Sequence, residues 1–304
     1  WLAVVHRELL LFSCLFFALG SLDEFAIDIL YLAGRLSGRI RTPVIDRQDV
    51  EGRDLSGPVA VIVPAWREEE VIGATMRHLL TAWPQEQMRL YVGCYANDPA
   101  TIAAAARAAR GRARARIVIH SGPGPTTKAD CMNRVYRAIE EDERREDIRF
   151  RMVVIHDAED MVDPAALPLF DAAIAKAPSR WVSGHYMDEF AEAHAKAMVV
   201  RDWLGAGIPS AGVGCAIARD RLAILDTRSE RRGPFDADSL TEDYELGLRV
   251  AEAGAKVAFL RVRGSDGRLV ATRAFFPRRL ETAVRQKTRW VCGIALQGWD
   301  RMGW

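Results

Sequence analysis

The chain has 304 residues, of which 49% are hydrophobic and 27% are charged, and its formal net charge is +1. This composition excludes a disordered chain and allows one large α/β core or two smaller ones. The near-neutral charge gives no basic face for nucleic acid, and five scattered cysteines without C-x-x-C spacing indicate neither a zinc site nor a disulfide framework.

The N-terminal segment, residues 1–36, contains two apolar stretches, Leu9–Leu19 and Phe25–Ala33. Spanning a bilayer takes about 20 apolar residues, and the basic cluster that begins at Arg35 is typical of the cytoplasmic side of a membrane. We therefore expect a membrane-associated helical segment. A buried helical hairpin is the alternative, because acidic residues such as Asp28 are costly inside a bilayer.

Residues 37–58 mix Gly, Pro, Asp and Arg without a hydrophobic period, which predicts a linker. Beyond it, strand-like runs alternate with helical stretches. The strands are expected at 59–63, 89–94, 116–119 and 152–155, and the helices near 68–82, 99–110 and 127–143. This alternation predicts parallel strands with right-handed crossovers, and ligands beyond the carboxyl ends of the strands. No G-x-G-x-x-G follows the first strand, which disfavours a dinucleotide-binding oxidoreductase.

Candidate binding residues follow all four predicted strands. They are Pro64, Ala65, Trp66 and Glu68 after the first, Asn97 and Asp98 after the second, Lys128 after the third, and Asp157, Glu159 and Asp160 after the fourth. Together these groups suit a base, a ribose, a phosphate and a metal. For Lys128 the alternative is a solvated side chain at a helix start. For Asn97 and Asp98, which precede Pro99, the alternative is a helix N-cap.

Three carboxylates crowd the end of the apolar strand at 152–155, namely Asp157, Glu159 and Asp160. Carboxylates at the mouth of a buried strand repel one another and lose hydration, so we expect a positive partner among them. Hard cations such as Mg²⁺ or Mn²⁺ take carboxylate oxygens and keep substrate phosphates as further ligands. The stretch predicts a metal-diphosphate site, with a solvated acidic loop as the alternative.

The second half contains weaker signals. A fifth strand is expected at 181–186 and a helix at 190–204, followed by a glycine-rich segment where the backbone could approach a bound sugar closely. Glu242 and Asp243 open an amphipathic helix that ends near Gly254, where helix capping alone could explain both acids.

A long helix is expected at 277–299. It places Gln286, Arg289 and Trp290 on one face, because they are spaced i, i+3 and i+4. An amide, a guanidinium and an indole side by side can bond a sugar, pair with phosphate and stack on a pyranose ring. The alternative is an amphipathic helix end at a membrane surface.

Taken in order, four motifs within residues 59–295 resemble those of the family 2 glycosyltransferases, in the branch of membrane-bound processive polysaccharide synthases. The motifs are Pro64 to Glu68, Asp157 to Asp160, Thr241-Glu242-Asp243, and Gln286 to Trp290. The resemblance implies a GT-A fold at 59–276, which is a Rossmann-like α/β fold with a mostly parallel sheet and helices on both faces, and an interface helix at 277–304 that leads towards the membrane. It also implies a UDP-sugar donor, a growing glycan acceptor, and Mg²⁺ or Mn²⁺ as cofactor.

The resemblance also implies roles for single residues. Asp243, beside Glu242, would be the general base that takes the proton of the acceptor hydroxyl in an inverting displacement. The nucleotide pocket would be lined by Pro64, Ala65, Trp66 and Glu68, with Lys128 beside them and Asn97 and Asp98 at the position of base recognition. Asp157 would face the ribose and base, and Glu159, or else Asp160, would ligate the metal. The acceptor and the diphosphate would be held by Gln286, Arg289 and Trp290.

We therefore expect an inverting, metal-dependent glycosyltransferase whose catalytic domain lies on the cytoplasmic side of a bacterial inner membrane. It would extend an exported polysaccharide together with an outer-membrane export or receptor partner. A single-sugar transferase acting on a lipid carrier and a catalytically silent scaffold of a surface (phage) receptor system are the alternatives. The sequence begins at Trp1 without Met and stops at Trp304, so we expect a fragment. The resemblance implies that cyclic di-GMP acts through a domain outside it.

Overall fold

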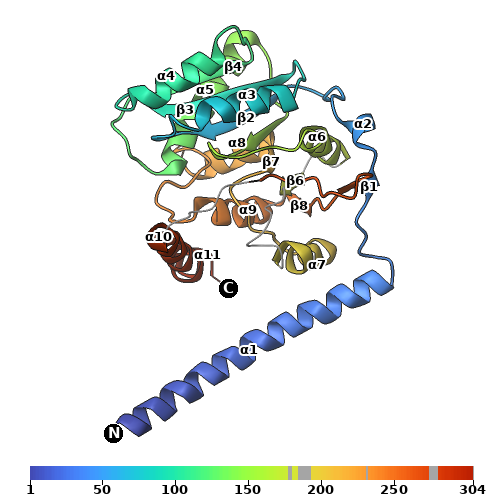
Figure 1. The fold of residues 1–304 in the computed structure, drawn as a ribbon, viewed down its shortest axis with the longest axis vertical. Helices are drawn as coiled ribbons and strands as arrows, with labels where there is room; N and C mark the ends of the chain where they lie inside the picture. The colour runs from blue at the N-terminus through green and yellow to red at the C-terminus, as the bar shows by residue number, and fades with distance from the viewer. Residues whose placement is uncertain (177–179, 184–192, 231, 274–279, 304) are drawn as a thin grey trace.

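A seven-stranded sheet forms the centre of the computed structural model, which describes residues 1–304 except 177–179, 184–192, 231, 274–279 and 304 (Figure 1). In spatial order the strands are β4 (Ala115–His120), β3 (Met88–Tyr95), β2 (Val59–Pro64), β5 (Met152–Ile155), β7 (Cys215–Ala218), β6 (Arg180–Ser183) and β8 (Lys256–Phe259). The first four run parallel, and β7 is antiparallel to both β5 and β6. The four predicted parallel strands are confirmed to within one residue at each end, and the sheet is mostly parallel as expected.

Helices cover both faces of this sheet. One face holds α3 (Ile72–Ala82), α4 (Pro99–Ala109) and α6 (Ala166–Lys176), and the other holds α5 (Lys128–Glu146), α8 (Arg219–Arg228) and α9 (Glu242–Glu252). Successive side chains of a strand point to opposite faces, so Val61 and Val63 of β2 join the first core while Ile62 joins the second. Because both faces are buried, the central strands are apolar throughout, which is why the sequence predicted them well.

The segment predicted as a linker packs against the domain at two points. Its strand β1 (Val44–Ile45) pairs in parallel with β9 (Arg263–Gly264), and a short helix, α2 (Arg47–Val50), follows. Arg47 forms ion pairs with Asp163 at 2.8 Å and with Asp266 at 3.2 Å. These partners lie far along the chain, so no local hydrophobic period could indicate them.

The weaker predictions of the second half are met in part. The expected fifth strand corresponds to β6, and its predicted residues 184–186 lie outside the described residues. The expected helix at 190–204 corresponds to a π-helical segment, η1 (Ala193–Ala197), and α7 (Met198–Leu204), while 190–192 lie outside the described residues. The sequence analysis missed β7, which has four residues and directly follows the glycine-rich segment.

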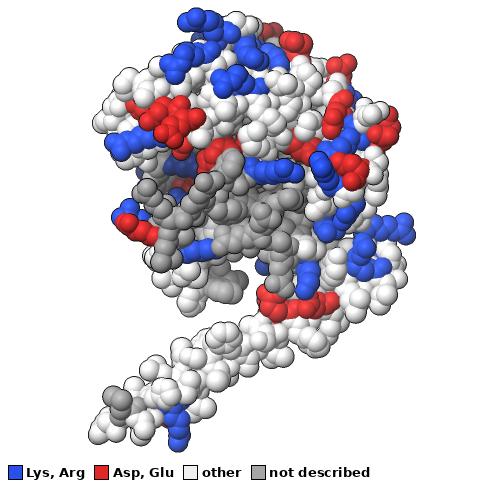
Figure 2. All heavy atoms as spheres, in the orientation of Figure 1, with Lys and Arg blue, Asp and Glu red and all other residues white. Residues whose placement is uncertain are grey.

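The N-terminal segment is one continuous helix, α1 (Leu2–Leu36), that projects from the domain as a rod (Figure 1). The side of this helix that Figure 2 shows is mostly uncharged, and its apolar side chains are exposed. Among the described residues it is the one helix long and apolar enough to cross a membrane. The alternative of a buried helical hairpin is wrong, because none of its most apolar window is buried.

The C-terminal segment forms three consecutive helical pieces. They are α10 (Leu280–Trp290), the π-helical segment η2 (Val291–Gln297) and α11 (Gly298–Met302). The long helix predicted here is thereby found, apart from its first three residues, 277–279, which lie outside the described residues.

Candidate active site

A pocket of about 260 Å³ lies at the carboxyl ends of β2, β3, β4 and β5. It is lined by Pro64, Ala65, Trp66, Glu68, Tyr95, Pro125, Thr126, Lys128, Cys131, Asp157, Ala158 and Glu159. Parallel strands bring the segments that follow them to one edge of the sheet. Most of the residues predicted to bind a nucleotide and a metal therefore meet in one place, which we call the strand-end pocket.

An aromatic wall closes one side of the strand-end pocket. The rings of Trp66 and Tyr95 meet edge to face with their centroids 5.1 Å apart, and the His120 ring lies 5.2 Å behind Tyr95. Burial raises the pKa of Tyr95 to about 12, so its hydroxyl is neutral and bonds Thr126 Oγ1 at 2.7 Å. Such a wall offers a planar apolar surface for a base to stack on.

Asn97 and Asp98 lie outside the lining and instead hold the loops that form it. The Asp98 carboxylate caps α4 by accepting from the Thr101 N–H at 3.3 Å, and it accepts from the Arg67 N–H at 2.6 Å. Asn97 exchanges two hydrogen bonds with the backbone of Gly124, both 2.8 Å long. The N-cap alternative is confirmed for Asp98, and neither residue is among those that line the strand-end pocket.

Two carboxylates of the fourth strand end line the pocket, Asp157 and Glu159. Burial, and next the nearby charges of Asp157 and Glu68, raise the pKa of Glu159 to about 7. Burial also raises the pKa of Glu68, and the charge of Asp157 adds to that rise. A neighbouring cation would stabilise the charged form of these carboxylates. Carboxylate oxygens are also the ligands that Mg²⁺ and Mn²⁺ prefer.

The set fits a cation that shares its coordination with substrate. Among the described residues, no three His, Cys, Asp or Glu side chains are grouped so that they could hold a metal by themselves. Mg²⁺ usually binds through one or two carboxylates and completes its shell with phosphate oxygens and water. Asp157 and Glu159 supply that number of carboxylates.

Asp160 lies behind the acidic loop instead of in the pocket. It is fully buried, and its Oδ2 accepts from the Asp157 N–H at 2.9 Å and lies 3.0 Å from His156 Nδ1. This carboxylate shapes the turn that presents Asp157. Of the three carboxylates predicted at the metal site, Asp157 and Glu159 line the strand-end pocket and Asp160 does not.

Lys128 connects two groups of acids. Its Nζ forms an ion pair with Asp157 Oδ1. Burial opposes the charge of Lys128, but the carboxylates of Asp157, Glu242 and Asp243 outweigh it and raise the pKa of the amine. The lysine is therefore a fixed positive charge between the strand-end pocket and the first turn of α9, and the alternative of a freely solvated side chain is wrong.

The acid pair Glu242 and Asp243 lies in that first turn. Burial, and next the charge of Asp243, raise the pKa of Glu242 to about 7, while Lys128 and Arg289 act in the opposite direction. Burial likewise raises the pKa of Asp243 against the pull of Lys128. The helix dipole favours negative charge in this turn, and Asp243 Oδ1 also accepts from the Tyr244 N–H at 2.8 Å.

The glycine-rich segment before β7 lies directly against Asp243. Gly212 has φ +77°, and a Cβ added there would overlap the Asp243 carboxylate. Because β7 is antiparallel to β5, with Cys215 opposite Ile155, this segment reaches the same edge of the sheet as the strand-end pocket. The glycine repeat in the sequence predicted that the backbone comes close to another group here. It did not indicate that this group is the Asp243 side chain.

Arg289 connects the C-terminal helix with the acid pair, because its charge lowers the pKa of both Glu242 and Asp243. On the same helix Lys287 Nζ lies 4.7 Å from the centre of the Trp290 ring, and Gln286 is half-buried. The three residues predicted to hold the acceptor and the diphosphate, Gln286, Arg289 and Trp290, thus lie on one helix, and the charge of Arg289 acts on the acid pair.

Two residues missed by the sequence analysis fix this helix in place. The side chain of Gln297 accepts from the Leu240 N–H at 2.7 Å and donates to the Asp238 carbonyl at 3.0 Å. A Cβ on Gly293 would lie 2.5 Å from Thr241 Cγ2, so the helix backbone touches the T-E-D segment. Both residues lie beyond the Q-x-x-R-W motif, and no pattern in the sequence singles them out.

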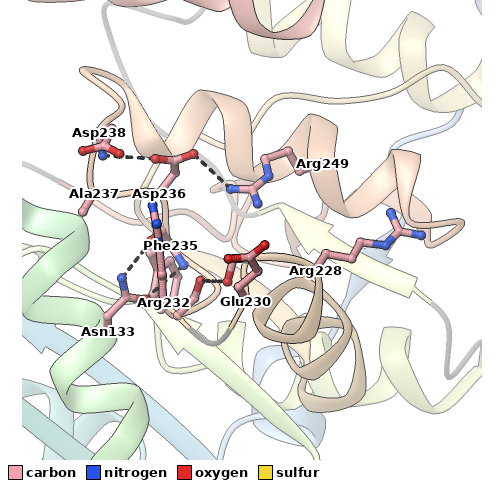
Figure 3. A pocket seen from close by; sticks show the side chains of 11 residues that line it. Asn133, Arg228, Glu230, Arg232, Phe235, Asp236, Ala237, Asp238 and Arg249 are labelled. Atoms are coloured by element: carbon pink, nitrogen blue, oxygen red, sulfur yellow. Dashed lines mark hydrogen bonds and ion pairs between the residues drawn. The ribbon is translucent and has the colours of Figure 1, made fainter.

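A second pocket, of about 410 Å³, lies behind the segment that leads into α9 (Figure 3). It is lined by residues 228–230, 232–233 and 235–238 together with Asn133 and Arg249. The Asn133 amide exchanges hydrogen bonds with the Phe235 backbone at 2.8 and 3.1 Å, and Asp236 pairs with Arg249 and with Arg301 of α11. Its lining includes none of the predicted site residues, and its ion pairs support the T-E-D segment from the other side.

A family model described as "Glycosyltransferase like family 2" matches residues 57–293. Two proteins from Escherichia coli, "Bacteriophage adsorption protein B" of strain K12 and "Bacteriophage N4 adsorption protein B" of strain O157:H7, are each 33% identical to 94% of this chain. The chain spans only 43% of the length of these relatives.

A solved structure shows the same fold. It is the mannosyltransferase PcManGT from Pyrobaculum calidifontis in complex with GDP-Man and Mn²⁺, with a TM-score of 0.62 and 19% identity over 90% of this chain and 71% of that chain. At this identity the likeness establishes the GT-A type of fold and nothing about the ligands of this chain.

Proposed function

The chain belongs to glycosyltransferase family 2, and on this premise we propose that it is an inverting, metal-dependent glycosyltransferase that uses a UDP-sugar to extend an exported bacterial polysaccharide. One observation supports the proposal above the others. Lys128 pairs with the carboxylate of Asp157 in the strand-end pocket, and the charges of Glu242 and Asp243 also act on its amine. The amine of Lys128 therefore interacts both with the proposed donor site and with the candidate base, Asp243.

The donor would occupy the strand-end pocket. Its base would stack on the aromatic wall of Trp66 and Tyr95, and its ribose would face Asp157. The diphosphate would lie towards Lys128 and Glu159. A bound Mg²⁺ or Mn²⁺, held by Asp157 and Glu159, would offset negative charge as the diphosphate leaves; the similar mannosyltransferase structure contains Mn²⁺ and GDP-Man.

Asp243 would act as the general base. Its raised pKa suits a carboxylate that accepts a proton near neutral pH. As the acceptor oxygen bonds to the anomeric carbon, its proton passes to Asp243, the bond between that carbon and the diphosphate oxygen breaks, and nucleoside diphosphate leaves. Attack from the face opposite the leaving group inverts the configuration, and Arg289 and Lys128 offset the charge that develops.

The acceptor would lie along the C-terminal helix, where Gln286 and Trp290 offer an amide and an indole to a sugar. We place the catalytic domain on the cytoplasmic side of a bacterial inner membrane, with α1 as the membrane segment. An outer-membrane export or receptor partner, and cyclic di-GMP acting through a domain outside this chain, complete the proposed system.

A second candidate is a silent scaffold of a surface receptor, which the names of the two E. coli relatives favour. The site argues against it. Glu242 is buried and Asp243 is half-buried, and carboxylates whose pKa values are raised in this way cluster at functional sites. A single-sugar transferase acting on a lipid carrier differs from a polymerase only in the length of its product, which a gel resolves.

The test is release of nucleoside diphosphate from a panel of UDP-sugars and GDP-mannose, with Mn²⁺ or Mg²⁺, by the full-length protein in membranes supplied with cyclic di-GMP. Asp243→Asn should abolish release. The matched control is Asp220→Asn, which changes an exposed acid in the first turn of α8 and should leave release unchanged. No release from any donor would contradict the transferase and favour the scaffold.

A further inference from the structure

The loop between β4 and α5 forms the outer side of the strand-end pocket through Pro125 and Thr126. We propose that Asn97 is a positioning residue that latches this loop and thereby sets the affinity for the donor. The inference rests on the proposed function, since it assigns the nucleotide to this pocket. It gives Asn97 a role different from the direct base contact expected from the sequence.

The latch is the side-chain amide of Asn97, whose NH₂ group and oxygen both form hydrogen bonds with the backbone of Gly124. Asn97 Nδ2 donates to the Gly124 carbonyl and Asn97 Oδ1 accepts from the Gly124 N–H, each at 2.8 Å, across 27 positions of sequence. Asn97 is exposed, so water competes for both groups. A paired arrangement of this kind fixes the direction of the loop backbone as well as its distance.

Further contacts set the latched loop against the aromatic wall. A Cβ added at Gly124 would lie 2.6 Å from Trp66 Cζ3 and 2.8 Å from Tyr95 Cδ1, so the bare backbone packs on both rings. Two residues further on, Thr126 Oγ1 bonds the Tyr95 hydroxyl at 2.7 Å. The position of the loop therefore fixes the width of the space between the wall and Lys128.

The neighbouring residue positions the opposite loop. Asp98 accepts from the N–H of Arg67, which has φ +58°, and so holds the turn that presents Trp66 and Glu68. Adjacent residues at the end of β3 thus position both loops around the pocket without lining it. Since these loops would contact the nucleotide and not the reacting carbon, a loosened latch should weaken donor binding and spare the chemical step.

We expect Asn97→Ala to raise the KM for the donor about five- to tenfold, which is the low end of the effect of two lost hydrogen bonds because the site is exposed, and to leave kcat within about twofold. Gly124→Ala should act in the same direction, because its methyl group pushes the loop off Trp66. Ser121→Ala, an exposed residue of the same loop outside the pocket lining, is the control that should keep the KM of the wild type.

A KM of Asn97→Ala equal to that of the wild type, or a loss confined to kcat, would overturn the latch. Calorimetric binding of UDP or GDP with Mn²⁺, together with thermal unfolding, separates this outcome from others. Weaker nucleotide binding at an unchanged Tm supports positioning, whereas a lowered Tm with unchanged binding assigns Asn97 a purely structural part. A wild type that binds nucleotide but transfers no sugar contradicts the proposed function and leaves the latch measurable, while a wild type that binds no nucleotide overturns both.

Discussion

The acid pair Glu242 and Asp243 makes the rate of transfer dependent on pH. The base must be deprotonated to accept a proton, and the pKa of Glu242 is raised to about 7 while that of Asp243 is raised as well. We therefore expect the acid limb of the kcat profile to lie at a higher pH than the ordinary pKa of an aspartate would give. Glu242→Gln removes a negative neighbour, which lowers the pKa of Asp243, so the acid limb of the kcat profile should move to lower pH. A limb that stays in place or moves upward would exclude Asp243 as the titrating base.

Lys128 should shift the same profile in the opposite direction. Its positive charge lowers the pKa of both Glu242 and Asp243, so Lys128→Met should move the acid limb of kcat to higher pH. It should also weaken donor binding, because the diphosphate loses a charged partner. Lys256→Met, at an exposed position of β8, is the control. Measuring kcat and KM across pH for both variants tests the prediction, and equal profiles would contradict it.

At the scale of elements, the C-terminal helix depends on Gln297 for its position relative to the acids. Gln297 bonds the backbone of Leu240 and Asp238, just before the T-E-D motif. Gln297→Ala should lower kcat about tenfold, equivalent to about 1.4 kcal/mol, because Arg289 is then less well held against Asp243. Arg285→Ala is the control. It removes an exposed ion pair with Glu281 on the same helix and should change kcat less than twofold.

The sequence predicted those elements whose signal is local. Strands β2 and β5 are continuous apolar runs because helices cover both of their faces, and the residues of the candidate site follow them directly. Strand β7 was missed because four residues after a glycine-rich segment give no period. The contacts of Asn97 with Gly124 and of Gln297 with Leu240 were out of reach for another reason. They join residues far apart in sequence through side-chain amides, which no spacing rule indicates.

At the scale of the whole molecule, α1 is longer than a bilayer requires. Its 35 residues correspond to about 52 Å at the helical rise per residue, against about 30 Å of hydrocarbon. About 14 residues should therefore extend outside the hydrocarbon, which matches residues 23–36. That part contains Asp28, whose carboxylate pairs with Lys196 of η1 at 2.7 Å and so lies level with the catalytic domain.

Thiol labelling of inside-out membrane vesicles, whose cytoplasmic face is turned towards the reagent, tests this placement. Cys14 lies in the apolar part of α1 and is exposed on the isolated helix, so only lipid would shield it from a membrane-impermeant maleimide. In a Cys292→Ser background, which removes the one partly exposed cysteine of the described domain, Cys14 should react only after detergent is added. Ala33→Cys should give a thiol that reacts at once. Equal reactivity at positions 14 and 33 before detergent would show that α1 lies outside the bilayer. The attachment of the domain to the membrane would then depend on other segments, such as the exposed apolar residues Val291, Leu296 and Trp299 of the C-terminal helix.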